Sequence, residues 1–556
     1  MSDSPPSTPI VTEDSHASAA LRAEEVAAAG SGFILITGAK LWFLVSATIL
    51  NLGLPRFLGD TAQFGDFGTI NSLISILNMV LVTGALQAVS KRVSERPELA
   101  QAVRRKAIRI QTLLGGGLFV VLIVGADVIC DDLLRDKTLA PYLRIAAVVT
   151  LSYAFYASFI GILNGLRDFA SQALFDIVFA TLKVTLIVGL VLAGFGVMGA
   201  FVGFAGAAVL VTIGAWWVTR RKVALVGPTP PSPDIRLLGF MLQVMGFVFA
   251  MNVLIQGDVV VLKRAAFEAI QSVLDAGGSV PWVTDALRGA APDSDPTRAL
   301  TAALVGLYRA AKNVSLLPYQ GVIALTFVIF PLLSRATFET DQESTRLYVR
   351  HALRLAWIIV AAVATVLAAG GEGLAVTLFG EDYQLAGGTL LPMVIGMSCL
   401  AMMYLVGTVL IAAARPLDAL AVTALVALAE MAVLYLVVSD VPDAQLGSRT
   451  TYMVSVLTRA AWTSAAAGLI GLLLAAWRLR VCVQVPLPVS SLVRGSFAAM
   501  VALIVVMEFP QIGLWWVFVR ALTAGVTFLL VLVLTREITR DDWAIIRSTL
   551  SRRKVS

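Results

Sequence analysis

The sequence predicts an all-α polytopic membrane protein with about fourteen transmembrane helices. Of its 556 residues, 58% are hydrophobic and 14% are charged, whereas soluble proteins carry roughly 25% charged residues. Mean hydropathy is +0.86. Apolar stretches of roughly 20 residues, long enough to cross a bilayer, recur along the chain with short polar breaks between them. Lipid is therefore the main solvent of this chain.

The apolar stretches form two sets of six and a final pair. A Pro-rich linker at 227–236 separates an N-lobe, 32–226, from a C-lobe, 237–480. Residues 1–31 lack the features of a cleaved signal and are predicted to be a disordered cytoplasmic tail. The N-lobe spans are 32–54, 66–90, 108–129, 141–163, 173–195 and 197–218. The C-lobe spans are 237–262, 303–333, 355–379, 389–413, 417–438 and 451–476. The final pair, 493–509 and 513–535, occupies 493–535 and precedes a basic cytoplasmic tail, 536–556.

Lys and Arg collect in alternate loops, such as KRVSERPELAQAVRRK at 91–106 and TRRK at 219–222. Because positively charged loops stay in the cytoplasm, both termini are predicted to be cytoplasmic. The segment 263–302 is the longest external loop in this scheme, and its Gly, Pro and Asp content predicts a short helix followed by irregular structure.

The two lobes resemble each other in sequence at a shift of about 244 residues. Ser90 and Lys91 then align with Ser334 and Arg335. An even number of spans keeps both copies in one orientation, so the sequence predicts a parallel repeat around a central cavity that opens to alternate sides.

Ionisable residues inside the spans are the candidate functional groups, because a charge in hydrocarbon costs about 2.5–3.5 kcal/mol. Four cations in cavity-lining spans suit an anionic substrate: Lys40, Lys183, Arg309 and Lys312. Two acids, Asp258 and Glu430, are candidates for binding a coupling proton or sodium ion. For each residue the alternative is a structural interhelix pair or a side chain that snorkels to the headgroups. Arg459 and Arg520 lie nearer to span ends and favour that structural interpretation.

The sequence contains no constellation typical of an enzyme. It lacks a Walker loop, an H-E-x-x-H pair and a G-x-S-x-G elbow, and its three cysteines and two histidines have no metal-ligand spacing. No cofactor, metal or nucleic-acid partner is predicted. Transport would draw on ion gradients, membrane potential or substrate flow.

Three stretches carry a resemblance to a known family: LGLPRFLGDTAQFGDFGTINSL at 52–73, TGALQAVSKRVSE at 83–95 and LYRAAKNVSLLPYQGVIALTFVIFPLLSRA at 307–336. The chain resembles the polysaccharide-exporter branch of the multidrug/oligosaccharidyl-lipid/polysaccharide (MOP) superfamily over roughly residues 32–480. The final pair of spans is similar to that of the fourteen-span members.

The resemblance implies a flippase in the bacterial cytoplasmic membrane. It would move a polyprenyl-diphosphate-linked oligosaccharide, the repeat unit of a surface polysaccharide, from the cytoplasmic to the outer leaflet. The four cations would hold the diphosphate while the polyprenyl tail stays among the membrane lipids. Polysaccharide polymerases and glycosyltransferases are the implied partners.

Other functions remain open from the sequence. A lipid II flippase would share the fold, and a drug or cation antiporter of the same superfamily would need an acidic cavity. A membrane glycosyltransferase or polymerase would need a large external catalytic loop, for which 263–302 is the candidate. A scaffold for a polysaccharide or division complex would not depend on the intramembrane charges.

Overall fold

The computed structural model describes residues 13–225, 238–275, 280, 282, 295–323, 342–413, 415–440 and 448–537, and these ranges contain helices and no strand. By length and composition, 12 helical segments are able to cross a membrane. One of them, Phe169–Ala224, contains two helices, and one further long helix, Pro296–Ser315, is too polar to meet the criterion. Counting these gives 14 long helices in the described ranges, which confirms the predicted class.

The long helices are named here by lobe. In the N-lobe they are α1 (Glu13–Leu58), α2 (Thr61–Glu95), α3 (Ala100–Val124), α5 (Ala140–Gly165), α6 (Phe169–Leu190) and α7 (Gly196–Ala224). In the C-lobe they are α8 (Leu238–Asp275), α10 (Pro296–Ser315), α12 (Gln342–Phe379), α14 (Leu390–Ala412), α15 (Pro416–Ser439) and α16 (Arg449–Val483). The final pair is α17 (Val489–Val506) and α18 (Leu514–Leu534). The short segments are η1 (Pro97–Leu99), α4 (Ala126–Val128), η2 (Ile129–Leu133), η3 (Lys137–Leu139), η4 (Val191–Phe195), η5 (Glu381–Tyr383) and α13 (Gln384–Gly387).

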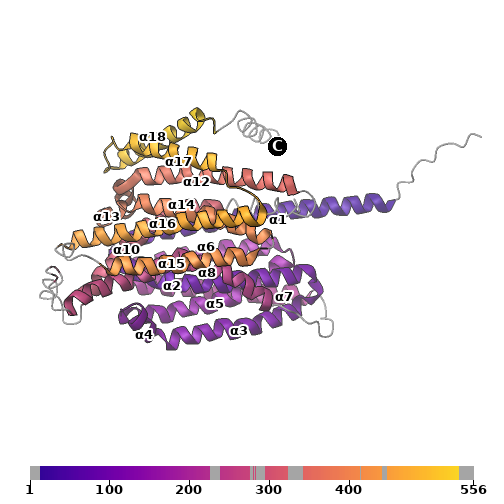
Figure 1. The fold of residues 1–556 in the computed structure, drawn as a ribbon. Coiled ribbons are helices and arrows are strands. Elements are labelled where there is room, and N and C mark those ends of the chain that lie inside the picture. Colours follow the sequence, from indigo (N-terminus) through magenta and orange to yellow (C-terminus); the bar gives the residue numbers. More distant parts are fainter. Residues whose placement is uncertain are drawn as a thin grey trace, which may run out of the picture.

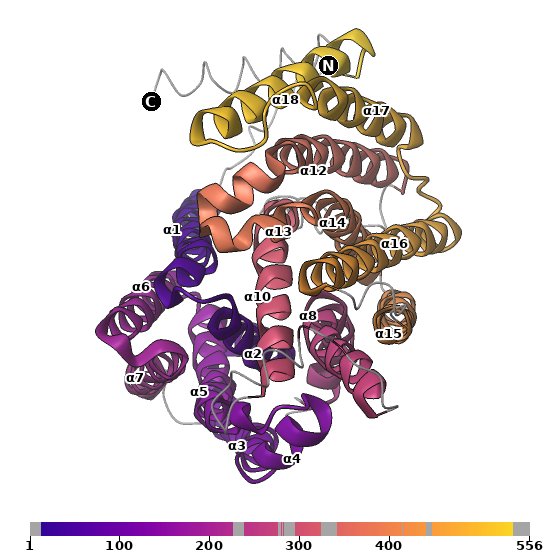
Figure 2. The same cartoon turned by 90° about the vertical axis from the view of Figure 1, so that its left-hand side faces the viewer.

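Most of the long helices run roughly parallel to one another, with α4 and α13 at the same end of the bundle (Figure 1), whereas α10 is tilted across the middle of it (Figure 2). This end is called the α13 end below, and the loop charges predict that it is external. Bulky apolar side chains stand exposed on the outer surface, for example Leu113, Leu428 and Trp515 at 76%, 70% and 80%. Exposed apolar area on this scale is expected of a surface that contacts lipid.

The two lobes repeat the same neighbour relationships. In the N-lobe, α5 packs against α2, α3 and α7, while α6 packs against α1 and α7. In the C-lobe, α14 packs against α10, α12 and α16, while α15 packs against α8 and α16. The fourth and fifth helices of the N-lobe therefore have the same neighbours as the fourth and fifth helices of the C-lobe, as expected for the parallel repeat that the sequence predicts.

The lobes meet through a few helices. The pairs α2 with α8, α2 with α10, α1 with α10 and α1 with α12 all pack together. Seen along the helix axes, α10 lies at the middle of the assembly, with α2 on one side and α8 on the other (Figure 2). A side chain on α10 is thus able to face either lobe.

Several helices extend beyond the predicted spans. α1 begins at Glu13, within the predicted tail, where Ala, Leu and Glu favour helix. α8 continues to Asp275 and α10 begins at Pro296, so both ends of the predicted loop 263–302 are helical. Most of 276–294, the linker 227–236 and nearly all of the tail 536–556 lie outside the described residues.

A break lies in the helix where the sequence places a proline. α10 ends at Ser315, a turn follows at Leu316, and residues 317–323 are helical again. Pro318 accounts for the break, because its ring clashes with the carbonyl one turn earlier and its nitrogen has no hydrogen to donate. Pro331, the second proline of the predicted span, lies outside the described residues.

The final pair of helices packs on the outside of α12, at the edge of the C-lobe (Figure 2). Arg520 of α18 is 6% exposed. Its guanidinium donates to the carbonyl oxygens of Ala369, Val506 and Phe509 at 2.7, 3.0 and 2.5 Å. Val506 is the last residue of α17, and Phe509 lies in the turn that follows it. Arg520 therefore joins α17, α18 and α12, as the structural interpretation of this residue predicted.

Beyond α18, a carboxylate anchors the same three helices from the opposite end. Glu537 is 2% exposed and accepts from Arg354 of α12 at 2.8 Å and from Arg494 of α17 at 3.0 Å. Burial raises the pKa of Glu537, but hydrogen bonds from Ser491, Arg354 and Arg494 outweigh burial and lower it below its ordinary value. Glu537 is therefore held in its charged form.

Candidate functional site

A buried ion pair joins α8 to α10 inside the C-lobe. Lys312 donates to both carboxylate oxygens of Asp258, with Nζ 2.5 Å from Oδ2. The Tyr308 hydroxyl donates to the same Oδ2 at 2.8 Å. Tyr308 and Lys312 are four residues apart on α10, so both side chains lie on one face and reach one carboxylate. Asp258 and Lys312 are 0% and 2% exposed, and each neutralises the other's charge.

The second predicted acid belongs to the same group of polar contacts. Glu430 of α15 is 3% exposed, and its Oε1 lies 2.7 Å from Ser464 Oγ of α16. Ser464 Oγ in turn lies 3.1 Å from the Tyr308 hydroxyl oxygen. Within the described part of the chain, Glu430 Oε2 is buried and has no hydrogen-bond partner. We call Lys312, Asp258, Tyr308, Ser464 and Glu430 the C-lobe chain.

Arg309 follows Tyr308 on α10 but faces the N-lobe. Its Nη1 donates to Gly68 O at 3.1 Å and to Ser72 Oγ at 2.5 Å, both on α2. A Cβ on Gly68 would lie 2.4 Å from Arg309 Cδ, so a glycine is needed for the arginine to pass. Arg309 is 5% exposed, and no carboxylate among the described residues forms an ion pair with it.

Lys183 of α6 is the second predicted cation for which the described residues show no carboxylate partner. It is partly buried, and its Nζ lies 4.0 Å from the centre of the Phe204 ring, a cation–π distance. Arg309 is the other predicted cation of this kind. Lys183 and Arg309 therefore contribute an excess of positive charge, relative to the described carboxylates, in the interior of the bundle.

Lys40, the remaining predicted cation, has an acidic partner. Its Nζ lies 2.7 Å from Asp176 Oδ2, which joins α1 to α6 within the N-lobe. The four predicted cations thus divide into two that are paired with carboxylates, Lys40 and Lys312, and two that have no carboxylate partner among the described residues, Lys183 and Arg309. Residue spacing along the chain did not predict this division.

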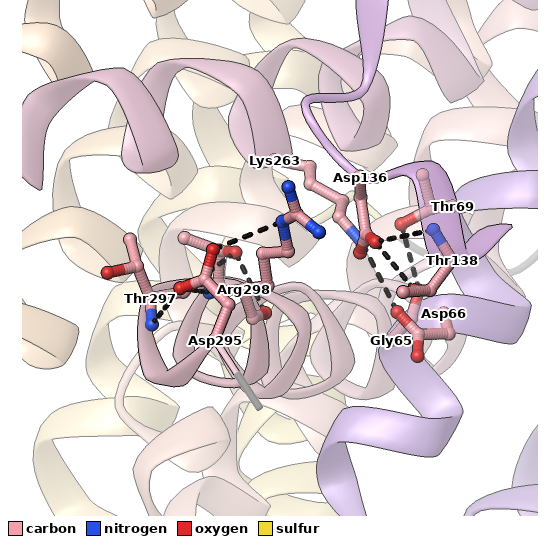
Figure 3. Close-up of polar contacts among 10 residues, drawn as sticks. Gly65, Asp66, Thr69, Asp136, Thr138, Lys263, Asp295, Thr297 and Arg298 are labelled. Atoms are coloured by element: carbon pink, nitrogen blue, oxygen red, sulfur yellow. Dashed lines mark hydrogen bonds and ion pairs between the residues drawn. The ribbon is translucent and has the colours of Figure 1, made fainter. Parts of the chain in front are cut away.

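At the α13 end, one buried lysine bridges the lobes (Figure 3). Lys263 of α8 is 1% exposed. Its Nζ lies 2.8 Å from Asp136 Oδ2, next to η3, and 3.2 Å from Asp66 Oδ1 of α2. Burial raises the pKa of Asp136, but the Lys263 charge and hydrogen bonds from Lys263 and Thr138 outweigh it and lower the pKa overall. We call Lys263, Asp66 and Asp136 the interlobe triad.

Beside this triad, α2 and α10 touch backbone to backbone. A Cβ on Gly306 would lie 2.0 Å from Thr61 O, and one on Gly65 would lie 1.8 Å from Ala302 O. Small residues of this kind let transmembrane helices approach closely. The two helices are therefore closed against each other at the α13 end.

A pocket of about 470 Å³ opens beside this closure, lined by both lobes. Its lining includes Asp60 and Thr61 from the N-lobe and Asp382 and Arg449 from the C-lobe. Asp60 also caps α2 by accepting from Ala62 N at 3.0 Å. This pocket does not reach any of the six predicted site residues.

Several residues of these contacts were not predicted as site residues. Lys263 was assigned to a loop because α8 was predicted to end at 262, and Asp66 and Asp136 were not singled out. Tyr308 and Ser464 carry no charge, so a search for intramembrane charges passes over them. The sequence offers one signal for these two residues, which is their position near charged residues. Tyr308 is next to Arg309, and Ser464 follows Arg459 by five residues.

Comparison with known proteins identifies the family. A family model described as "Polysaccharide biosynthesis protein" matches residues 31–337, which is more than half of the chain. This chain belongs to the polysaccharide biosynthesis protein family. The predicted resemblance to a family of polysaccharide proteins is thereby confirmed. A search of curated proteins found no match.

Solved structures share the fold of this family member. A structure titled "Lipid II flippase MurJ, inward closed conformation" aligns with a TM-score of 0.65 at 14% identity, covering 91% of this chain and 100% of that one. An outward-facing multidrug resistance MATE family transporter aligns with a TM-score of 0.51 at 18% identity, covering 82% and 96%. A MOP superfamily transporter from Pyrococcus furiosus aligns at 0.50 and 17% identity, covering 81% and 96%. These similar structures are of transporters and flippases rather than enzymes.

Proposed function

We propose that this family member is a flippase for a polyprenyl-diphosphate-linked oligosaccharide, the repeat unit of a surface polysaccharide. It would move this lipid from the cytoplasmic to the outer leaflet of the bacterial cytoplasmic membrane, with both chain termini in the cytoplasm. The family, the 14-helix fold and the absence of an enzyme motif in the sequence support the proposal.

The observation that carries the proposal is the excess of positive charge formed by Lys183 and Arg309. A diphosphate needs cationic donors, and in a low-dielectric interior an unpaired cation is costly unless a ligand compensates it. Arg309 Nε is buried and has no partner among the described residues, so it remains free to donate. Lys40 and Lys312 would join this site only if their pairs with Asp176 and Asp258 opened.

The interlobe triad and the contact of Gly65 and Gly306 support a transport cycle. Together they close the α13 end between the lobes. We propose that this end is external and that the closed arrangement admits the lipid-linked sugar from the cytoplasmic side. Rocking of the lobes would then open the α13 end and release the sugar outside.

A flipping assay tests the function and the site together. The purified protein is reconstituted in vesicles with a fluorescent polyprenyl-diphosphate-linked sugar, and a membrane-impermeant quencher reports the lipid in the outer leaflet. We expect Lys183→Gln and Arg309→Gln each to slow flipping about tenfold or more, because one hydrogen bond to a charged group contributes about 1.5–3 kcal/mol. Arg144→Gln, which breaks an exposed pair with Asp127 at the α13 end, is the matched control.

The outcomes separate the alternatives. No flipping of any lipid-linked sugar by the natural sequence would show that the proposed function is wrong. Flipping that is unchanged in both variants would show instead that these cations do not bind the diphosphate. Vesicles with lipid II or with a cationic dye test the lipid II flippase and the drug antiporter, and we expect slower transport of both than of the oligosaccharide lipid.

A further inference from the structure

We infer that Glu430 binds a proton in the closed arrangement and that this proton, not a sodium ion, is the ion held by the C-lobe. The inference deepens the proposed function, on which its role in transport rests, by naming the ion and its binding atom. It follows from counting the hydrogens that the C-lobe chain requires.

Three oxygen–oxygen contacts run in series through the C-lobe chain. They join Asp258 Oδ2 to the Tyr308 hydroxyl at 2.8 Å, that hydroxyl to Ser464 Oγ at 3.1 Å, and Ser464 Oγ to Glu430 Oε1 at 2.7 Å. Each contact needs one hydrogen between its oxygens. Tyrosine and serine supply one hydrogen each, so the two hydroxyls satisfy only two of the three contacts.

The third hydrogen has to come from one of the two carboxyl groups. Asp258 accepts from the Lys312 ammonium on both of its oxygens and is therefore ionised. A proton on Glu430 Oε1 completes the series, since Glu430 then donates to Ser464, Ser464 to Tyr308, and Tyr308 to Asp258. All three contacts become hydrogen bonds that point the same way.

Burial supports the same assignment. Glu430 is 3% exposed, and its Oε2 has no partner in the described ranges. An ionised carboxylate with one unsatisfied oxygen in a dry interior would be strongly disfavoured, whereas a neutral carboxyl group is tolerated.

Among the helices packed against α15, α8 contributes Asp258 to this region and α16 contributes the Ser464 hydroxyl. α14 has no acidic or basic residue in its sequence. Lys312, from α10, is the nearest source of positive charge, and Asp258 already holds it.

A sodium ion fits this group poorly. Hard cations take several oxygen ligands and compete badly with an ammonium that already occupies the carboxylate. Here the Lys312 ammonium holds both oxygens of Asp258, which leaves the oxygens of Glu430, Ser464 and Tyr308, and these are linked to one another. The C-lobe chain thus contains its own fixed cation and has one site left, for a proton.

Release of this proton would act on α10. With Glu430 ionised, Ser464 would turn its hydrogen toward Glu430, and two oxygen lone pairs would face each other between Ser464 and Tyr308. Tyr308 lies next to Arg309, which holds α2. Loss of the proton therefore weakens the hold of α16 on the helix that carries the proposed diphosphate ligand, and this links the proton to the lobe contact.

Infrared difference spectroscopy tests the proton site without any substrate. The purified protein in lipid is titrated with acid and base, and the carbonyl stretch of protonated carboxyl groups is recorded. We expect a band from a buried protonated carboxyl group that is lost in Glu430→Gln. Glu508→Gln, at an exposed carboxylate, is the matched control. Replacing potassium by sodium at constant pH should leave the band unchanged.

A second variant guards against misfolding. Ser464→Ala keeps Glu430 but removes its partner, so the band should persist and shift in its titration midpoint. A band that is kept in Glu430→Gln, or one that sodium abolishes, would overturn the inference. Flipping is measured on the same preparations: a lost band with normal flipping in Glu430→Gln would leave the function standing without proton coupling. A normal band without flipping would contradict only the function.

Discussion

Lys263 Nζ lies 2.8 Å from Asp136 Oδ2 although the two residues belong to different lobes and both are almost fully buried. An ion pair of this kind repays its desolvation only while both partners are present, and removal of one partner costs about 3–5 kcal/mol. The pair is therefore well placed to set how firmly the α13 end is closed.

We predict that Lys263→Met opens the α13 end. The substitution leaves buried Asp136 and partly buried Asp66 without their cation, and separation of the lobes lets water reach both carboxylates. Spin labels at Lys137→Cys and Ser272→Cys, exposed positions on opposite lobes, report the separation as a distance distribution. The mean distance should increase in Lys263→Met and stay unchanged in Arg144→Gln, which breaks an exposed pair within one lobe. Equal distributions in all three proteins would show that the triad does not hold the lobes together.

We predict that Gly306→Ala separates α2 from α10. Its Cβ would lie 2.0 Å from Thr61 O, which is backbone and has no rotamer to escape into. Overpacking of this kind costs about 1–3 kcal/mol. The control is Gly321→Ala, further along the same span, where a Cβ would meet nothing within 4 Å. The same spin-label pair should show longer distances for Gly306→Ala alone, and a similar change in both variants would contradict the prediction.

We predict that Arg520→Met loosens the final pair of helices. It removes three hydrogen bonds to carbonyl oxygens, and although the Val506 carbonyl keeps its bond from Phe509 N, the Phe509 carbonyl loses the arginine that donates to it. Hydrogen bonds to a charged group contribute about 1.5–3 kcal/mol, so unfolding of this region should become easier by about 3 kcal/mol. Thermal unfolding in detergent measures the change, and Arg480→Gln, at an exposed arginine, should leave the midpoint in place. A loss no greater than in Arg480→Gln would mean that Arg520 is not a structural anchor.

We predict a pH dependence for the same docking through Glu537. Its pKa is lower in the folded protein than the ordinary 4.5, so its stabilising effect is complete above pH 4.5 and is lost as the pH falls through the lower folded value. The natural sequence should therefore unfold at a higher temperature than Glu537→Gln near neutral pH, and the difference should shrink in acid. Glu98→Gln, at an exposed carboxylate, should show no such pH-dependent difference. A difference that is constant with pH would rule out the charge of Glu537 as its cause.

Sequence reasoning predicted the fold well because its signals are local. Span length and apolar composition depend on neighbouring residues only, and the structure contains long apolar helices where they were predicted. Helix ends were predicted less well, since α1 and α8 continue through polar residues that hydropathy excludes from a span. A helix needs only backbone hydrogen bonds and suitable propensities outside the apolar core.

The sequence singled out charged residues of the candidate site but not the contacts between them. Asp258 and Lys312 were both singled out by their charge, yet one was expected to bind an ion and the other a diphosphate. They bind each other across 54 residues of sequence. Such pairing depends on how α8 and α10 are rotated in the bundle, and a single sequence contains no information about that rotation. Charge alone also could not reveal that Tyr308 and Ser464 complete the series to Glu430.

The contact between Gly65 and Gly306 has a consequence for the thermodynamics of closure. Neither residue has a side chain, so the backbones meet without freezing any rotamers, and joining the surfaces costs little conformational entropy. Little enthalpy is stored there either, because glycine offers few atoms for dispersion contacts. The equilibrium between a closed and an open α13 end then depends on a few polar groups. Ligands, pH or a single substitution are able to shift this equilibrium.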